Sequence, residues 1–161
     1  MRTFIKTLNY CGGCMESKYF DELDIGETFT TNARTITEAD QLNYAGLSGN
    51  FDPIHLDKGK MEATEFGGRL VYGYLVLNVM EGQKVQTGLI EDSVIAFYGI
   101  DKARFTNPVM IGDTVHTELT VLDLDEKDES SGVVVLEEKG VNQDGEDVVV
   151  AETRTLIKKR D

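Results

Sequence analysis

The second half of the chain carries the pattern of hydrophobic and polar residues that is typical of β-strands. Between Thr114 and Asp125, apolar side chains alternate with Thr, His and Glu, which predicts a strand with one buried face. Similar runs follow along the chain, and Asn142–Gly145 forms a tight turn between the last two. The strands expected in this half are residues 94–99 continuing into 100–105, 114–125, 133–141 and 147–159.

A different pattern runs from Val71 to Val85, which is apolar on almost every side. Asn78 and Glu81 are its main polar members. Such a run is too hydrophobic for a surface helix, and its length favours a buried helix over a parallel strand, the competing interpretation. One buried helix and several long antiparallel strands predict a single α+β domain, with the sheet wrapped around the helix.

Turn and capping residues predict shorter elements ahead of this helix. Gly26 marks a turn, and the Thr-rich stretch Thr28–Ile36 predicts a strand. Thr37 followed three residues later by Asp40 is a capping-box pattern, so a helix is expected over Glu38–Leu47. The residues expected on its apolar side and at its end are Leu42, Tyr44, Ala45, Gly46 and Gly49.

Pro53 determines the expected conformation of the next segment. It restricts its own φ angle and moves Asp52 away from helical geometry, so Asn50–His55 is predicted to be a rigid loop and not a helix. The polar stretch Asp57–Thr64 is compatible with a short helix that covers one end of a site.

The composition is that of one globular domain, with 161 residues of which 40% are hydrophobic and 28% charged. The net charge of −13 argues against binding to nucleic acid or to an anionic membrane surface. No apolar run approaches the roughly 20 residues of a membrane span, and Met1–Asn9 lacks the apolar core of a signal peptide. We therefore expect a cytoplasmic protein without a membrane partner.

Cys11 and Cys14 form a single Cys-Gly-Gly-Cys near the start of the chain. A zinc site would need further ligands, but there is no second cysteine pair and the two histidines lie far apart. A redox pair would need a strand and a helix around it, and neither is indicated. We expect no metal and no cofactor, and we interpret residues 1–17 as a flexible extension ahead of a domain at 18–161.

Groups suited to acid–base chemistry gather between Asn50 and Gly73. His55 can exchange protons near neutral pH, since an unperturbed imidazole has a pKa of about 6.5. Asn50 and Asp52 add an amide and a carboxylate, and Gly73 opens the apolar run, where free N–H groups at a helix start favour negative charge. The alternatives are a histidine that only hydrogen-bonds a loop, an Asp52 that only forms an Asx turn, and a Gly73 that only relieves crowding.

The order of these residues forms a longer motif. It consists of Gly49-Asn50-Phe51-Asp52-Pro53-Ile54-His55, Ala63, Phe66-Gly67, Leu70-Val71 and Tyr72-Gly73. This motif resembles the signature of the MaoC-like family of (R)-specific enoyl-CoA hydratases, and the segments Tyr19–Gly26 and Tyr98–Phe105 are also similar to that family. The resemblance implies a hot-dog fold, in which an antiparallel sheet wraps around a long central helix, and a homodimer or higher homo-oligomer.

The sequence departs from the family pattern at three places. The family usually has Asp at position 50 and Asn at position 52, and here the two are exchanged. We expect Asp52 to take over the task of the carboxylate while Asn50 orients water or His55; a badly aimed carboxylate is the alternative. Tyr72 stands where the family has histidine, and the N-terminal extension has no counterpart.

The resemblance implies a hydro-lyase of fatty acid metabolism. It would add water reversibly to a trans-2-enoyl thioester of CoA or acyl carrier protein and form an (R)-3-hydroxyacyl thioester. His55, Asp52 and Asn50 would act on the water, and the Gly73 N–H would polarise the thioester carbonyl. The alternatives are an acyl-CoA thioesterase on the same fold and a non-catalytic acyl-thioester-binding subunit of a hetero-oligomer.

Other residues near the motif are candidates for substrate binding. The aromatic candidates for an acyl pocket or the core are Tyr72, Phe51, Phe66 and Tyr98. The basic candidates for the CoA phosphates are Arg69, Lys102 and Arg104, together with Lys58 and Lys60. Each basic residue taken alone is more typical of a solvated surface charge. His116, at a polar position of the expected strand 114–125, is interpreted as a surface residue.

Overall fold

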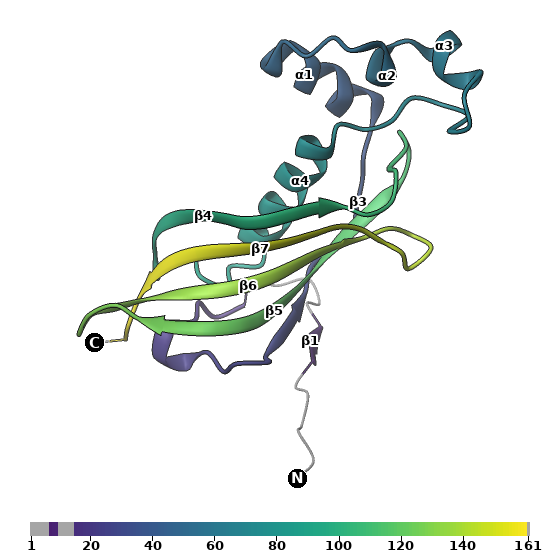
Figure 1. The fold of residues 1–161 in the computed structure, drawn as a ribbon. Helices are drawn as coiled ribbons and strands as arrows, with labels where there is room; N and C mark the ends of the chain where they lie inside the picture. Colours follow the sequence, from purple (N-terminus) through teal and green to yellow (C-terminus); the bar gives the residue numbers. More distant parts are fainter. Residues whose placement is uncertain (1–6, 10–14, 161) are drawn as a thin grey trace.

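Residues 7–9 and 15–160 are described by the computed structural model, and long strands dominate their second half (Figure 1). The strands are β1 (Thr7–Asn9), β2 (Thr28–Thr30), β3 (Arg34–Thr35), β4 (Val94–Phe105), β5 (Thr114–Glu126), β6 (Ser131–Val141) and β7 (Asp147–Lys158). The helices are the 3-10 turn η1 (Phe20–Glu22), α1 (Glu38–Ser48), α2 (Pro53–Leu56), α3 (Lys58–Glu62) and α4 (Gly73–Gln86).

The strands form one sheet in the order β1-β2-β5-β6-β7-β4, and β3 pairs separately with β5. β5, β6 and β7 follow each other as antiparallel neighbours, and β4 lies antiparallel to β7 at the edge. The long strands predicted from the alternating pattern are confirmed, with boundaries within two residues of those expected. The tight turn predicted at Asn142–Gly145 joins β6 to β7.

The buried helix predicted in the middle of the chain is also confirmed. α4 crosses one face of the sheet, and Val76, Val79 and Met80 in its centre are almost fully buried (Figure 1). They pack in one hydrophobic cluster with Val115 of β5 and Val149 of β7. Burial of such side chains contributes about 1.5–3 kcal/mol each, so the helix–sheet contact stabilises the domain substantially.

Helix α1 begins as its capping box predicts and ends at Gly49, whose φ of 70° is in the left-handed region. The side of α1 that is buried differs from the one expected. Leu42 is 52% exposed, whereas Gln41 and Ala45 are buried. The polar Gln41 can occupy the buried face because its amide nitrogen finds two main-chain carbonyl partners there.

The segment predicted to be a loop around Pro53 contains a helical turn, so that prediction is wrong for residues 53–56. Asp52 keeps the extended conformation expected before a proline, but it acts as the N-cap of α2 and its side chain accepts a hydrogen bond from Ile54 N. Proline is well suited to the first position of a helix, where no N–H is needed. The short helix expected within Asp57–Thr64 is α3.

The single strand expected over residues 28–36 is interrupted between β2 and β3. Thr31 N donates to the carbonyl of Thr117, and the Gln83 amide donates to the carbonyl of Asn32. These contacts satisfy two of the backbone groups in the interruption, and pairing with β5 resumes at Arg34. Residues expected in the core also differ, because Phe51, Phe66 and Tyr98 are 65%, 42% and 48% exposed.

Part of the predicted N-terminal extension adds to the sheet. Residues 7–9 form β1, which runs parallel to β2. Cys11 and Cys14 lie outside the described residues, and the division of the chain at residue 17 stays a prediction.

A buried ion pair joins α4 to the sheet. Lys84 Nζ lies 2.7 Å from Glu138 Oε1 of β6, and the side chains of both residues are at most 4% exposed. Glu138 Oε1 also accepts from the Thr153 hydroxyl, and Lys84 contacts the more exposed Glu81 at 2.6 Å. Burial opposes the charge of Lys84, but Glu138 and Glu81 outweigh it and raise the pKa of this amine.

We expect Lys84→Met to lower the free energy of unfolding by about 3–5 kcal/mol, because it leaves the Glu138 carboxylate buried without a cation. Urea unfolding followed by circular dichroism measures the change. The double variant Lys84→Met/Glu138→Met should recover much of the loss, and Lys58→Met, which removes an exposed pair with Glu62, should cost less than about 1 kcal/mol. A double variant as unstable as Lys84→Met would contradict this account.

Candidate active site

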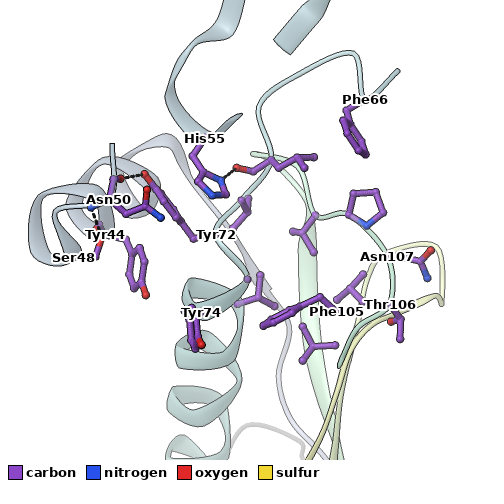
Figure 2. Close-up of a pocket in the computed structure, with 18 residues that line it drawn as sticks. Tyr44, Ser48, Asn50, His55, Phe66, Tyr72, Tyr74, Phe105, Thr106 and Asn107 are labelled. Atoms are coloured by element: carbon purple, nitrogen blue, oxygen red, sulfur yellow. Dashed lines mark hydrogen bonds between the residues drawn. The ribbon is translucent and has the colours of Figure 1, made fainter. Parts of the chain in front are cut away.

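A cavity of about 670 Å³ opens beside the start of α4. Figure 2 shows His55, Asn50 and Tyr72 at one side of it and Phe66, Thr106 and Asn107 at the other. Phe105, Val148 and Val149 belong to the apolar part of its wall. The cavity therefore combines a small polar group with a hydrophobic compartment, as binding sites for organic molecules commonly do.

His55 lies on α2 with one ring nitrogen held by the main chain. Its Nδ1 is 2.8 Å from the carbonyl oxygen of Leu70 (Figure 2). A carbonyl can only accept, so Nδ1 carries the hydrogen and Nε2 of the neutral ring keeps its lone pair. In residues 15–160, Nε2 has no hydrogen-bond partner within the chain, which leaves it available as a base toward the cavity that His55 lines.

Tyr72 packs against the His55 ring. The two ring centroids are 3.8 Å apart at 32°, and the Tyr72 hydroxyl donates to the main-chain oxygen of Asn50 at 2.6 Å. Burial, the charge of Asp52 and Tyr44 raise the pKa of Tyr72, so its hydroxyl stays protonated and remains a donor. Tyr72 thus lines the cavity as expected, and it also ties the loop before α2 to the start of α4.

Asn50 and Asp52, which are exchanged relative to the family pattern, lie in two different environments. Asn50 lines the cavity, its Oδ1 accepts from Asp52 N at 3.1 Å, and its Nδ2 has no partner among the described residues. Asp52 is exposed, its Oδ1 accepts from Ile54 N at 3.0 Å, and it is absent from the cavity wall. The amide faces the cavity, while the carboxylate makes the Asx-type contact that was the alternative interpretation.

Gly73 is the first residue of α4, and no side chain caps this end of the helix. The first-turn N–H groups of a helix have no partner within it, so they are available at the cavity wall that Gly73 helps to form. A Cβ atom at position 73 would lie 2.6 Å from the Phe105 ring. Glycine at this position lets the Phe105 ring pack directly against the first turn of α4, in addition to any contact with a ligand.

The structure does not bring the predicted cationic residues into the cavity. Arg69 donates twice to Glu38, at 2.9 and 2.5 Å, and this contact lowers the pKa of Glu38. Lys102 pairs with Glu152 at 2.5 Å, and Arg104 donates to a main-chain carbonyl. Within the part of the chain that the structure describes, no Lys or Arg lines the cavity.

Of the predicted aromatic residues, Phe66 and Tyr72 line the cavity and Phe51 does not. Sequence reasoning missed Tyr44, Phe105 and Asn107 in the wall, as well as Gln41 behind it. Phe105 belongs to the segment Tyr98–Phe105, whose resemblance to the family could have indicated that it lies near the site. The buried role of Gln41 had no such signal, because a polar residue in a half-exposed helix normally faces solvent.

Two kinds of site are not found among the described residues. No group of three or more His, Cys, Asp or Glu side chains in them is arranged to hold a metal ion. None of the helices that the structure describes is both long enough and apolar enough to pass through a membrane.

Comparison with known proteins reveals a family match over most of the chain. The family described as the MaoC like domain matches residues 21–143. Protein MaoC of Klebsiella aerogenes is 42% identical over 103 residues, which are 64% of this chain but only 30% of that protein. An (R)-specific enoyl-CoA hydratase of Rhodospirillum rubrum is 31% identical over 106 residues, or 66% of this chain and 71% of that enzyme.

Solved structures agree with the fold. A protein from Archaeoglobus, named as a monoamine oxidase regulatory protein, is 38% identical with a TM-score of 0.84 and covers 90% of this chain and 97% of its own. A Mycobacterium tuberculosis protein described as a double hot-dog is 21% identical with a TM-score of 0.78, covering 89% of this chain and 45% of its own. The predicted hot-dog fold is thereby confirmed.

We expect Gly73→Ala to destabilise the protein by about 1–3 kcal/mol, because the added methyl group collides with Phe105 and overpacks the cavity wall. Thermal and urea unfolding measure the loss. Gly82→Ala is the matched control, since Gly82 lies in the same helix and a Cβ there meets no atom within 4 Å. It should stabilise the helix by up to about 1 kcal/mol. Equal effects of the two substitutions would contradict the packing argument.

Proposed function

Because the chain belongs to the MaoC-like dehydratase family, we propose that it is a hydro-lyase that adds water reversibly to a trans-2-enoyl thioester. The product is an (R)-3-hydroxyacyl thioester of CoA or of acyl carrier protein. The observation that carries this proposal is the position of His55 and Gly73 on one cavity. A base with a free Nε2 and an uncapped helix start are the two groups that addition to a thioester-conjugated double bond requires.

In the hydration direction, His55 Nε2 accepts a proton from a water molecule while the water oxygen forms a bond to C3. The electron pair of the C2–C3 double bond moves toward the thioester, and negative charge develops on the carbonyl oxygen. The N–H of Gly73 and the other free N–H groups in the first turn of α4 stabilise this charge. A single donor of this kind contributes on the order of 3 kcal/mol. The protonated His55 then delivers its proton to C2, so that one residue serves as base and acid and the ring returns to its starting state.

The neighbouring residues support this cycle in different ways. Asn50 Nδ2 is free to donate to the attacking water or to the product hydroxyl. Asp52, which the sequence led us to expect as a participant in proton transfer, is proposed instead to hold His55 in place through its cap on α2. Tyr72 supports the imidazole ring, and Phe66 and Phe105 provide apolar surface for the acyl chain.

One observation favours a second candidate function. Since the only carboxylate of the motif is engaged with α2 and is absent from the cavity wall, the chain is also suited to a non-catalytic subunit that binds acyl thioesters. Such a subunit would bind a CoA thioester without turnover. A thioesterase, the other alternative, would release free CoA thiol, and a thiol-reactive dye distinguishes that product from a hydrated thioester.

We expect the protein to hydrate crotonyl-CoA and His55→Gln to lower kcat at least about 100-fold, because the imidazole that is proposed to accept and return the proton is lost. Loss of the enoyl absorbance measures the rate. Asp52→Asn is the control, because asparagine caps a helix as well as aspartate does. It should keep kcat within about threefold.

A protein that is folded but inactive on enoyl-CoAs of every chain length would remove the hydro-lyase proposal. Activity that survives His55→Gln would remove the assignment of His55. A loss in Asp52→Asn as large as in His55→Gln would return the carboxylate to a direct role in proton transfer.

We further propose that two copies associate through β4. This edge strand pairs only with β7 in the described part of the chain. Its apolar side chains are 43–51% exposed: Val94, Ile95, Phe97, Tyr98, Ile100 and Phe105. A long apolar edge invites pairing with another strand, and a second copy presents the same complementary edge.

Light scattering coupled to gel filtration should therefore give about twice the mass of the chain. Ile100→Lys places a charge in the proposed contact and should shift the protein toward the monomer with its circular dichroism retained. Leu47→Lys, at an 85% exposed position on α1, is the control and should remain dimeric. A wild-type protein that is monomeric at micromolar concentration would exclude this association.

A further inference from the structure

Gln41 of α1 is a polar side chain in an apolar place. It is completely buried, with a relative exposure of 0%. Its Nε2 donates to the carbonyl of Leu70 at 2.9 Å and to the carbonyl of His55 at 3.0 Å, so both amide hydrogens are used. Because the two partners are acceptors only, they determine which way the amide group faces.

The other end of the same amide is not satisfied. Gln41 Oε1 is the one buried side-chain polar atom in the described residues without a hydrogen-bond partner. An unpaired buried acceptor destabilises a protein, and a methionine of similar length would avoid that cost. The position therefore calls for an explanation other than the stability of the core.

The carbonyl of Leu70 supplies that explanation. It accepts from Gln41 Nε2 and, at 2.8 Å, it is also the partner of His55 Nδ1. A carbonyl has two lone pairs, and here Gln41 and His55 occupy both. The Val71 N–H, which belongs to the same peptide unit as this carbonyl, donates to the carbonyl oxygen of Val109, so the peptide unit is held on both of its sides.

From this arrangement we propose that Gln41 is a positioning residue for His55. By orienting the Leu70 carbonyl, and by holding the His55 carbonyl as well, it keeps the hydrogen of the imidazole on Nδ1 and the lone pair on Nε2. Gln41 does not touch the substrate; it acts through a main-chain group on the residue that does. This inference rests on the proposed role of His55, but the state of the ring can be measured without any substrate.

The chain contains a matched comparison. Gln83 of α4 is also buried, and its Nε2 donates to the carbonyls of Asn32 and Val115 at 3.1 and 2.7 Å. Its Oε1 accepts from the Thr117 hydroxyl, so this glutamine is fully satisfied. Gln83 makes the same kind of contact without any link to His55, and its replacement reports the purely structural effect of losing a buried amide.

The test compares Gln41→Met with Gln83→Met in the full chain. Nitrogen-15 NMR of the imidazole rings distinguishes a hydrogen on Nδ1 from one on Nε2, and His116 serves as an internal reference. We expect the wild type and Gln83→Met to show the Nδ1–H form of His55, and Gln41→Met to show a mixture of both forms. In the hydration assay, Gln41→Met should lower kcat on the order of tenfold with KM changed by less than about twofold.

A Gln41→Met protein that keeps His55 entirely in the Nδ1–H form would overturn the inference, whatever its stability. An equal change of the ring in Gln83→Met would also overturn it, because the effect would then be structural. If Gln41→Met does not fold, Gln41→Asn retains the amide but withdraws it by one methylene, and the same shift of the ring is expected there. Absence of hydration by the wild type would count against the proposed function alone, since the NMR measurement needs no turnover.

Discussion

The hydrogen bond between His55 and the carbonyl of Leu70 connects the three segments from which the polar end of the cavity is built. His55 belongs to α2, Gln41 reaches the same carbonyl from α1, and Leu70 leads directly into α4. A main-chain carbonyl is a suitable anchor because its position is fixed by the backbone and it cannot donate. The tautomer of the neutral imidazole is thus selected by a main-chain carbonyl and not by a neighbouring carboxylate.

The start of α4 is the other fixed point of the site. Burial of Val76, Val79 and Met80 against the sheet holds the helix rigidly, and the absence of a Cβ at Gly73 lets Phe105 pack against its first turn. The uncapped N–H groups therefore lie next to apolar side chains, where an electrostatic contact is stronger than it would be in water. In the proposed reaction, the same packing that stabilises the domain also holds the helix start beside the carbonyl oxygen on which negative charge develops.

The charge distribution bears on how a substrate would be held. With a net charge of −13, the protein repels anions at long range. Three of the basic residues expected to bind CoA phosphates, Arg69, Lys102 and Arg104, are engaged with Glu38, Glu152 and the main chain. We infer that recognition inside the cavity depends on shape, apolar surface and hydrogen bonds. Cations that meet the phosphates would have to come from outside the wall, and the exposed edge at β4 is where a second copy would approach.

Much of this architecture could be read from local patterns. Alternating hydrophobic residues predicted the long strands, and the apolar run predicted α4, because both patterns follow the period of the backbone. Thr37 and Asp40 predicted the start of α1, because a capping box needs only two residues three positions apart. The motif around Pro53 also singled out His55.

Only the tertiary structure decided that Asn50 and not Asp52 faces the cavity, that Gln41 is buried, and that Arg69 pairs with Glu38. These outcomes depend on partners that lie far apart in the sequence: Leu70 is 29 residues from Gln41, and Glu38 is 31 residues from Arg69. A local pattern cannot predict such contacts, because the packing of α1 and α4 decides which distant groups meet.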